Sequence, residues 1–136
     1  MRVILYSFTK PEENIACEEY FFNKLNHDSN GDEFLRIWEC SNWFIVIGNS
    51  QRIDESVYLD ECIVRGIKVI RRCSAGGAVL QGPGCINFSL YLNLSTNTEL
   101  KNIRDSYRYI LGKLANVIYQ EHNISLEIRG ISDLVY

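Results

Sequence analysis

Residues 71–90 read RRCSAGGAVLQGPGCINFSL, with two arginines directly before a glycine-rich segment and apolar, strand-like residues on both sides. Glycine carries no Cβ, so its backbone adopts positive φ angles and approaches a ligand closely. Amide N–H groups in such a turn, together with the guanidinium groups of Arg71 and Arg72, suit a carboxylate or a phosphate. The stretch therefore predicts an anion-binding loop between two strands, built on Gly76, Gly77, Gly82 and Gly84.

The composition is that of an ordinary soluble domain. The chain has 136 residues, 46% of them hydrophobic and 23% charged, which is enough for a single domain with a core. Its net charge of −3 argues against a general nucleic-acid binder. The apolar run at the N-terminus is too short for a signal peptide or a membrane span. We therefore expect a cytoplasmic protein that binds neither nucleic acid nor membrane.

The five cysteines are scattered and form no CxxC pair, and neither His27 nor His122 stands at a zinc-finger spacing. This pattern is typical of reduced thiols that serve as small buried hydrophobes. The sequence thus predicts no metal site of its own.

Hydrophobic periodicity and turn residues predict alternating strands and helices. Helices are expected from Pro11, over 56–65 up to Gly66, and after a capping box at Thr96 and Glu99; Asn30–Gly31 is expected to be a turn. The expected strands cover 3–8, 34–38, 43–47, 67–70, 85–92, 124–128 and 131–136. The runs 34–38 and 43–47 are separated by Ser41 and Asn42 and predict a hairpin. The fold class is therefore α+β, with a mixed, largely antiparallel sheet packed with helices.

Two further expectations concern the strands. Ile86, Phe88, Leu90 and Leu92 alternate with polar residues, so the apolar face of this strand is expected to be buried. The chain ends on the apolar pattern of residues 134–136, so we expect the sheet to be incomplete at the C-terminus.

Two familiar phosphate motifs are excluded. A P-loop needs a lysine after its glycines, and a dinucleotide fingerprint opens a helix, whereas here a strand follows. The plain alternative is a glycine-rich turn with two solvated arginines.

The segment resembles the signature of the lipoate–protein ligase A family, within the biotin/lipoate ligase and octanoyltransferase superfamily. That motif runs approximately R-R-x-S-G-G-G-x-V-x-H-D-x-G-N-x-N-x-S. The chain matches it at Arg71, Arg72, Ser74, Gly76, Gly77, Val79, Gly84, Asn87 and Ser89. Segments 14–20, 35–38, 46–51 and 130–134 also resemble the family, in the right order. The departures are Ala75, Gln81 in place of histidine, Gly82-Pro83, Cys85 and Ser132.

The resemblance implies a biotin/lipoate ligase-like catalytic core that joins lipoate to ATP, with Mg²⁺, as lipoyl-adenylate. The acyl group then passes to a lysine of a lipoyl carrier domain, either a 2-oxoacid dehydrogenase acyltransferase subunit or the glycine cleavage H protein. In the family the catalytic lysine follows the Asn-Asp pair, at a position beyond Tyr136. Residues 1–136 are thus expected to be the N-terminal part of one catalytic domain and to be inactive alone. The implied substrate- and adenylate-binding residues are Trp38, Arg71, Arg72, Ser74, Gly76, Gly77, Ala78, Gln81, Asn87 and Asp133.

Each assignment has a plainer alternative. One arginine is a solvated strand end, Asn87 lies on an exposed face, Asp133 is a turn residue, and Trp38 belongs to the core rather than to an acyl slot. Glu18 and Glu19 are expected to be helix surface.

Two rival functions remain open. The run Gln81-Gly82-Pro83-Gly84 resembles octanoyltransferases, in which Cys73 or Cys85 would carry the acyl group as a thioester without ATP. The missing lysine favours a non-catalytic binding remnant or assembly partner.

Overall fold

A computed structural model describes residues 1–27, 33–95 and 97–136. The described chain divides into two compact units, Met1–Leu92 and Asn93–Tyr136. The turn expected at Asn30–Gly31 and the helix cap expected at Thr96 lie outside the described residues.

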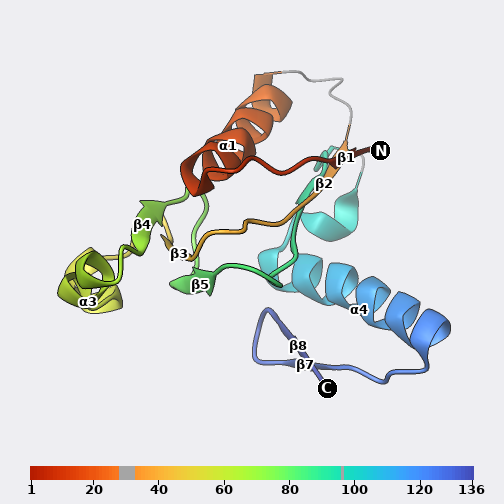
Figure 1. Ribbon diagram of the computed structural model, residues 1–136. Helices are drawn as coiled ribbons and strands as arrows, with labels where there is room; N and C mark the ends of the chain where they lie inside the picture. Colours follow the sequence, from red (N-terminus) through yellow and green to blue (C-terminus); the bar gives the residue numbers. More distant parts are fainter. Residues whose placement is uncertain (28–32, 96) are drawn as a thin grey trace. The chain divides into compact units, whose positions relative to one another are not determined.

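The first unit contains two three-stranded mixed sheets (Figure 1). The first sheet has the order β1-β2-β6, with β1 parallel and β6 antiparallel to the central strand; its strands are β1 (Arg2–Leu5), β2 (Phe34–Trp38) and β6 (Asn87–Tyr91). The second sheet has the order β4-β3-β5 and the same mixture of directions; its strands are β3 (Phe44–Ile47), β4 (Lys68–Arg71) and β5 (Val79–Gln81). The expected α+β class with mixed sheets is therefore confirmed.

The expected hairpin over 34–38 and 43–47 is wrong. Both strands exist, but β2 and β3 belong to different sheets. The residues that connect them bind the segment between β1 and α1. The N–H of Glu39 donates to Ser7 Oγ (3.0 Å), and Asn42 Nδ2 donates to the carbonyl of Thr9 (3.0 Å). Pairing with distant strands thus overrides the local turn signal.

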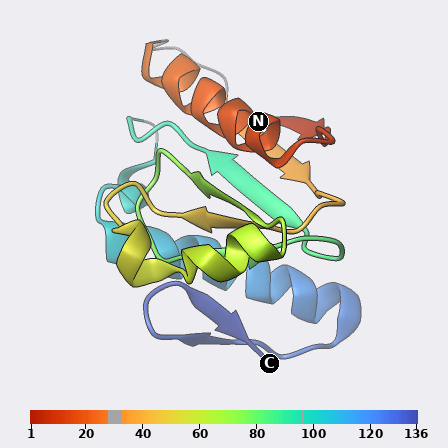
Figure 2. The same ribbon diagram turned by 60° about the vertical axis from the view of Figure 1, so that its left-hand side comes forward.

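Helix α1 (Pro11–His27) begins at Pro11 as predicted, with Glu12 and Glu13 in its first turn. It packs along β6 (Figure 2). The helix expected over 56–65 is present but shorter, as α3 (Leu59–Val64), and a separate one-turn helix that was not expected, α2 (Ile53–Ser56), precedes it. The extended backbone of Val57, with φ −146° and ψ 149°, separates them. Gly66 follows α3 with φ +64°, the conformation expected of a residue that ends a helix.

The predicted orientation of β6 is wrong. Ile86 and Phe88 are 72% and 48% exposed, whereas Tyr91 on the opposite face is 8% exposed. The polar face turns toward α1 because its hydroxyl groups find partners there: Ser89 Oγ donates to the Glu18 carboxylate, and Tyr91 Oη donates to the Glu18 carbonyl (3.2 Å). Burying a polar group costs little when it is hydrogen-bonded.

The core of the first unit joins α1 to both sheets. It consists of Ile15, Trp38, Cys40, Phe44 and Val46, with the half-buried Ile70 packed against it. Trp38 is the last residue of β2 and Phe44 the first of β3, so the core lies where the two sheets meet.

The second unit consists of a one-turn helix, η1 (Thr98–Leu100), the helix α4 (Ile103–His122) and a hairpin of β7 (Glu127–Arg129) and β8 (Asp133–Val135). Helix α4 begins at Ile103. Asn102 is the cap: its Oδ1 accepts from the amides of Arg104 (2.9 Å) and Asp105 (3.3 Å). No helix in the described part of the chain is long and apolar enough to cross a membrane.

Candidate anion-binding site

The glycine-rich segment forms the loop between β4 and β5, over residues 72–78. Gly76 has φ +113°, a backbone conformation that L side chains rarely adopt. Further along, Gly84 has φ +83° in the turn before β6. Residues 74–77 are exposed, so the loop presents its backbone to solvent.

A second turn, residues 48–51 after β3, packs tightly against this loop. The amide of Asn49 donates to the carbonyl of Ser74 (3.0 Å), and the amide of Arg72 donates to the carbonyl of Ile47 (3.0 Å). A Cβ placed on Gly48 would collide with the carbonyl oxygen of Gly76. Glycine is therefore required at position 48 for the two backbones to approach.

The two arginines have different partners. Arg71 Nη1 donates to three carbonyls of the 48–51 turn, those of Gly48 (2.8 Å), Asn49 (2.9 Å) and Gln51 (2.7 Å). Arg72 donates within its own loop, from Nη2 to the carbonyls of Ala75 (2.9 Å) and Gly77 (3.1 Å). Both guanidinium groups therefore bind main-chain oxygens rather than carboxylates, and their positive charge is not neutralised.

Amide donors of the loop remain available. Across the described ranges, the N–H groups of Ser74, Ala75, Gly76 and Gly77 donate to no protein acceptor. Successive free N–H groups beside uncompensated positive charge are the arrangement that binds carboxylate and phosphate oxygens. The loop can therefore hold an anion.

The other predicted site residues lie outside the run of free amides at 74–77. Ala78 is the last loop residue, and Gln81 pairs with Phe44 in the β3–β5 ladder. Among the described residues, Gln81 Oε1 is one of three buried side-chain atoms with no hydrogen-bond partner. Asn87 Nδ2 donates to the carbonyl of Cys85 (3.2 Å). Asp133 begins β8 in the second unit, where its Oδ1 accepts from Ser132 Oγ (3.4 Å).

Trp38 is a core residue in this structure. It is 4% exposed and stacks on Phe44, with ring centroids 6.4 Å apart and 26° between the planes. The guanidinium of Arg36 lies 5.0 Å from the centre of the indole. A role in an acyl slot stays a prediction.

Sequence reasoning missed a buried polar cluster, and the expectation that Glu18 is helix surface is wrong. Arg36 is 0% exposed and donates from Nη1 to Glu18 Oε1 (2.6 Å) and from Nη2 to Asn14 Oδ1 (2.7 Å). The carboxylate of Glu18 also accepts from Ser89, which stands opposite Arg36 in the ladder. The buried cluster, Asn14, Glu18, Arg36, Ser89 and Tyr91, thus ties α1 to β2 and β6.

The pattern that signals the buried cluster is present in the sequence. Asn14 and Glu18 are four residues apart and share a helix face. Arg36 alternates with Phe34 and Trp38, which marks it as inward-facing. Burial, followed by the negative charge of Glu18, raises the pKa of Tyr91 far above its usual range, so the phenol stays a donor.

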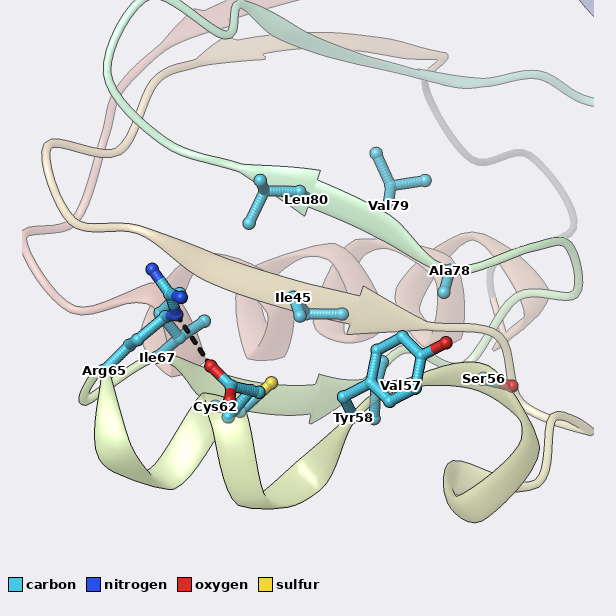
Figure 3. Close-up of a pocket in the computed structure, with 11 residues that line it drawn as sticks. Ile45, Ser56, Val57, Tyr58, Cys62, Arg65, Ile67, Ala78, Val79 and Leu80 are labelled. Atoms are coloured by element: carbon cyan, nitrogen blue, oxygen red, sulfur yellow. Dashed lines mark hydrogen bonds and ion pairs between the residues drawn. The ribbon is translucent and has the colours of Figure 1, made fainter.

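A groove of about 350 Å³ opens beside the loop (Figure 3). Ala78, Val79 and Leu80 form one wall, and Tyr58 and Cys62 lie on the α3 side. Most of its lining is apolar. The groove therefore continues the exposed loop along the edge strand β5.

The described residues give no support for a reactive cysteine or a metal centre at the loop. Burial, followed by the negative charge of Glu19, raises the pKa of the Cys73 thiol, which disfavours the thiolate. All five cysteines are free. No cluster of three or more metal-ligating His, Cys, Asp or Glu side chains occurs in the described residues.

Fold and loop together define an α+β domain with an exposed loop of free main-chain amides between β4 and β5. The model of the lipoyl protein ligase A/B catalytic domain matches residues 10–136, and the chain belongs to this family. The chain is 30% identical to lipoate-protein ligase A of Blochmanniella floridana over 138 residues, which is 99% of the chain and 36% of that relative. It therefore spans about a third of the relative's length.

Solved structures share the fold. A lipoate-protein ligase A bound with ATP superimposes with a TM-score of 0.73 at 20% identity, covering 97% of this chain and 52% of the other. A bipartite lipoate protein ligase of Thermoplasma acidophilum, studied with its E2 lipoyl domain, gives a TM-score of 0.66 at 21% identity. It covers 98% of this chain and 49% of the other.

Proposed function

We propose that this domain contributes the acyl-adenylate site of a lipoate–protein ligase, an enzyme that activates lipoate with ATP and transfers it to a lysine of a carrier protein. The observation that carries the proposal is the exposed run of free amides at residues 74–77 beside Arg72. Membership in the lipoyl ligase family and the likeness to an ATP-bound ligase support it.

The proposed chemistry brings two anions together, the carboxylate of lipoate and the α-phosphate of ATP. The carboxylate oxygen attacks the α-phosphorus and pyrophosphate leaves, and preorganised N–H donors stabilise the negative charge that builds up in this step. In the proposal the amides of Gly76, Gly77 and Ala78 bind the phosphate oxygens, and the guanidinium of Arg71 or of Arg72 supplies positive charge. Ser74, Gln81 and Asn87 orient the substrates.

Magnesium enters the proposal with the nucleotide. Mg²⁺ is usually held by substrate phosphates, waters and one or two carboxylates, so a dedicated cluster of acidic side chains is not needed. Asp133 belongs to the second unit, and its role toward the ion or the adenylate stays a prediction.

The proposed acceptor is a lipoyl carrier domain in the cytoplasm, either a 2-oxoacid dehydrogenase acyltransferase subunit or the glycine cleavage H protein. The archaeal ligase studied with its E2 lipoyl domain supports the first type. The chain covers about a third of its relative's length, so we propose the acyl-transfer activity for the full-length protein and not for residues 1–136 alone.

Lipoate-dependent exchange of labelled pyrophosphate into ATP tests the proposal, with the full-length protein as enzyme. We expect exchange that requires both lipoate and Mg²⁺, and lipoylation of a carrier-domain lysine when that domain is added. Absence of exchange with every acyl acid tried would refute the ligase. Acyl transfer from an acyl carrier protein without ATP would instead establish the octanoyltransferase alternative.

A further inference from the structure

Arg71 organises the 48–51 turn. This turn lies next to the loop of residues 72–78, which we call the anion loop. Three backbone carbonyl oxygens of residues 48–51 converge on its single Nη1 atom at 2.7–2.9 Å. Carbonyl dipoles that point at one spot repel each other unless a cation neutralises them, and here the guanidinium is that cation. The turn is therefore assembled around the side chain of Arg71.

The 48–51 turn also supports the anion loop. Gln51 closes it, because its Oε1 accepts from the amide of Gly48 (2.9 Å) and its Nε2 donates to Ser56 Oγ (3.1 Å). Asn49 then fixes Ser74 through its amide, and Gly48 lies directly against Gly76. A continuous set of contacts thus runs from Arg71 through 48–51 to the free amides of 74–77.

Arg72 is placed differently. Its bonds to the carbonyls of Ala75 and Gly77 lie within the loop itself, and its Nη1 makes no hydrogen bond in the described part of the chain. A donor of Arg72 is therefore still available to a ligand beside the amides.

We propose that Arg71 is a positioning residue that holds the 48–51 turn and, through it, the anion loop, whereas Arg72 is the arginine that contacts the anion. This division of roles rests on the proposed function of the loop. It assigns to each member of the pair a different response to substitution.

An ammonium group has three donors and the same charge as a guanidinium, so Arg71→Lys can still serve three converging carbonyls. Arg71→Met removes the cation and leaves the carbonyls opposed. Lysine cannot reproduce a planar guanidinium that bonds two loop carbonyls and an anion together, so Arg72→Lys is not conservative.

Hydrogen exchange of individual amides in the full-length protein tests the inference without any need for activity. In Arg71→Met we expect the Asn49 amide to exchange about tenfold faster or more, because its bond to Ser74 is no longer held. Arg71→Lys restores the protection to within about threefold of the wild type, whereas Arg72→Met leaves the Asn49 amide unchanged. Arg65→Met is the surface control, because Arg65 is the exposed residue that caps the C-terminus of α3 and pairs with Glu61.

Steady-state kinetics give the second readout. We expect Arg71→Met to lower kcat, with added guanidinium ion at a non-denaturing concentration restoring part of the loss. We expect Arg72→Lys and Arg72→Met to raise the KM for ATP or lipoate, with Arg71→Lys near the wild type.

Unchanged exchange at Asn49 in Arg71→Met would overturn the inference. An Arg71→Lys protein whose kinetic constants are as impaired as those of Arg72→Lys would also overturn it. If Arg71→Met does not fold, Arg71→Lys decides the matter. Should the wild type catalyse no pyrophosphate exchange, the proposed function fails, but hydrogen exchange still decides whether Arg71 holds the turn.

Discussion

Arg36 and Arg71 have similar numbers of hydrogen bonds but lie in opposite environments. Arg36 is 0% exposed, and its charge is matched by the carboxylate of Glu18 at 2.6 Å. Arg71 is exposed, and all its bonds go to neutral backbone carbonyls. The buried cluster therefore neutralises its charge internally, while the anion loop keeps a positive charge at the surface.

The difference follows from the cost of desolvation. An unpaired charge in the interior costs several kcal/mol, so Arg36 requires Glu18. At the surface water solvates Arg71, and a carboxylate partner there would compete with any bound anion. The buried cluster serves stability, whereas the anion loop is proposed to serve binding. This comparison yields the four predictions below.

Arg36→Met should have the largest effect on stability. It leaves the buried Asn14 and the largely buried carboxylate of Glu18 without their donor. Breaking a buried ion pair by removing one partner costs about 3–5 kcal/mol. Urea denaturation of the full-length protein measures the change in the free energy of unfolding.

Arg52→Met is the matched control, because Arg52 also pairs with carboxylates but its side chain is 67% exposed. An exposed pair contributes about 0–1 kcal/mol. Equal losses in the two variants would show that burial does not distinguish Arg36, and the comparison would fail.

Gly48→Ala should disrupt the anion loop more than it disrupts the fold. The new Cβ meets the carbonyl of Gly76, so one of the two backbones must move. We expect the free energy of unfolding to fall by about 1–3 kcal/mol and pyrophosphate exchange to fall about a hundredfold, since misplaced donors no longer match the charge of the transition state. Gly112→Ala is the control, because Gly112 lies in α4 and a Cβ there meets no atom within 4 Å. Full activity in Gly48→Ala would mean that the contact between turn and loop is not needed.

The sequence predicts the two regions unequally. The anion loop was identifiable because its signals are local: adjacent arginines, clustered glycines and a flanking strand pattern all fall within residues 71–90. Most helices and strands were also predicted, since periodicity is local. The strand β5 was not expected, because Val79–Gln81 is too short to show alternation.

The buried cluster depends on contacts between residues far apart in the chain, such as Ser89 with Glu18. A carboxylate on a helix is most often solvated, so Glu18 alone carried no sign of burial. For the same reason β6 was predicted with the wrong face inward. The pairing of β2 with β6 rather than β3 is also decided by packing that periodicity cannot report.

Gly76→Ala should have a smaller, more local effect than Gly48→Ala. Alanine at φ +113° is strained by about 1–2 kcal/mol, and its Cβ approaches only the flexible end of Arg72. We expect pyrophosphate exchange to fall about tenfold, through the shifted guanidinium. Gly66→Ala, also at positive φ but at the end of α3, should lose similar stability and keep its activity. A fully active Gly76→Ala protein would argue that the shape of the loop at this glycine is not required.

Cys73→Ala should have the smallest effect, and it tests whether the anion loop contributes a nucleophile or only donors. Burial raises the pKa of the Cys73 thiol, so the thiol is protonated at neutral pH and the thiolate appears only at a higher pH than in a free cysteine. Iodoacetamide should therefore alkylate Cys73 slowly at neutral pH, with the rate still rising above the pH at which a cysteine peptide reaches its plateau. The ligase activity of Cys73→Ala and of Cys73→Ala/Cys85→Ala should equal that of the wild type. Loss of acyl transfer in either variant, together with a trapped thioester in the wild type, would assign the loop to thiol chemistry and overturn the ligase proposal.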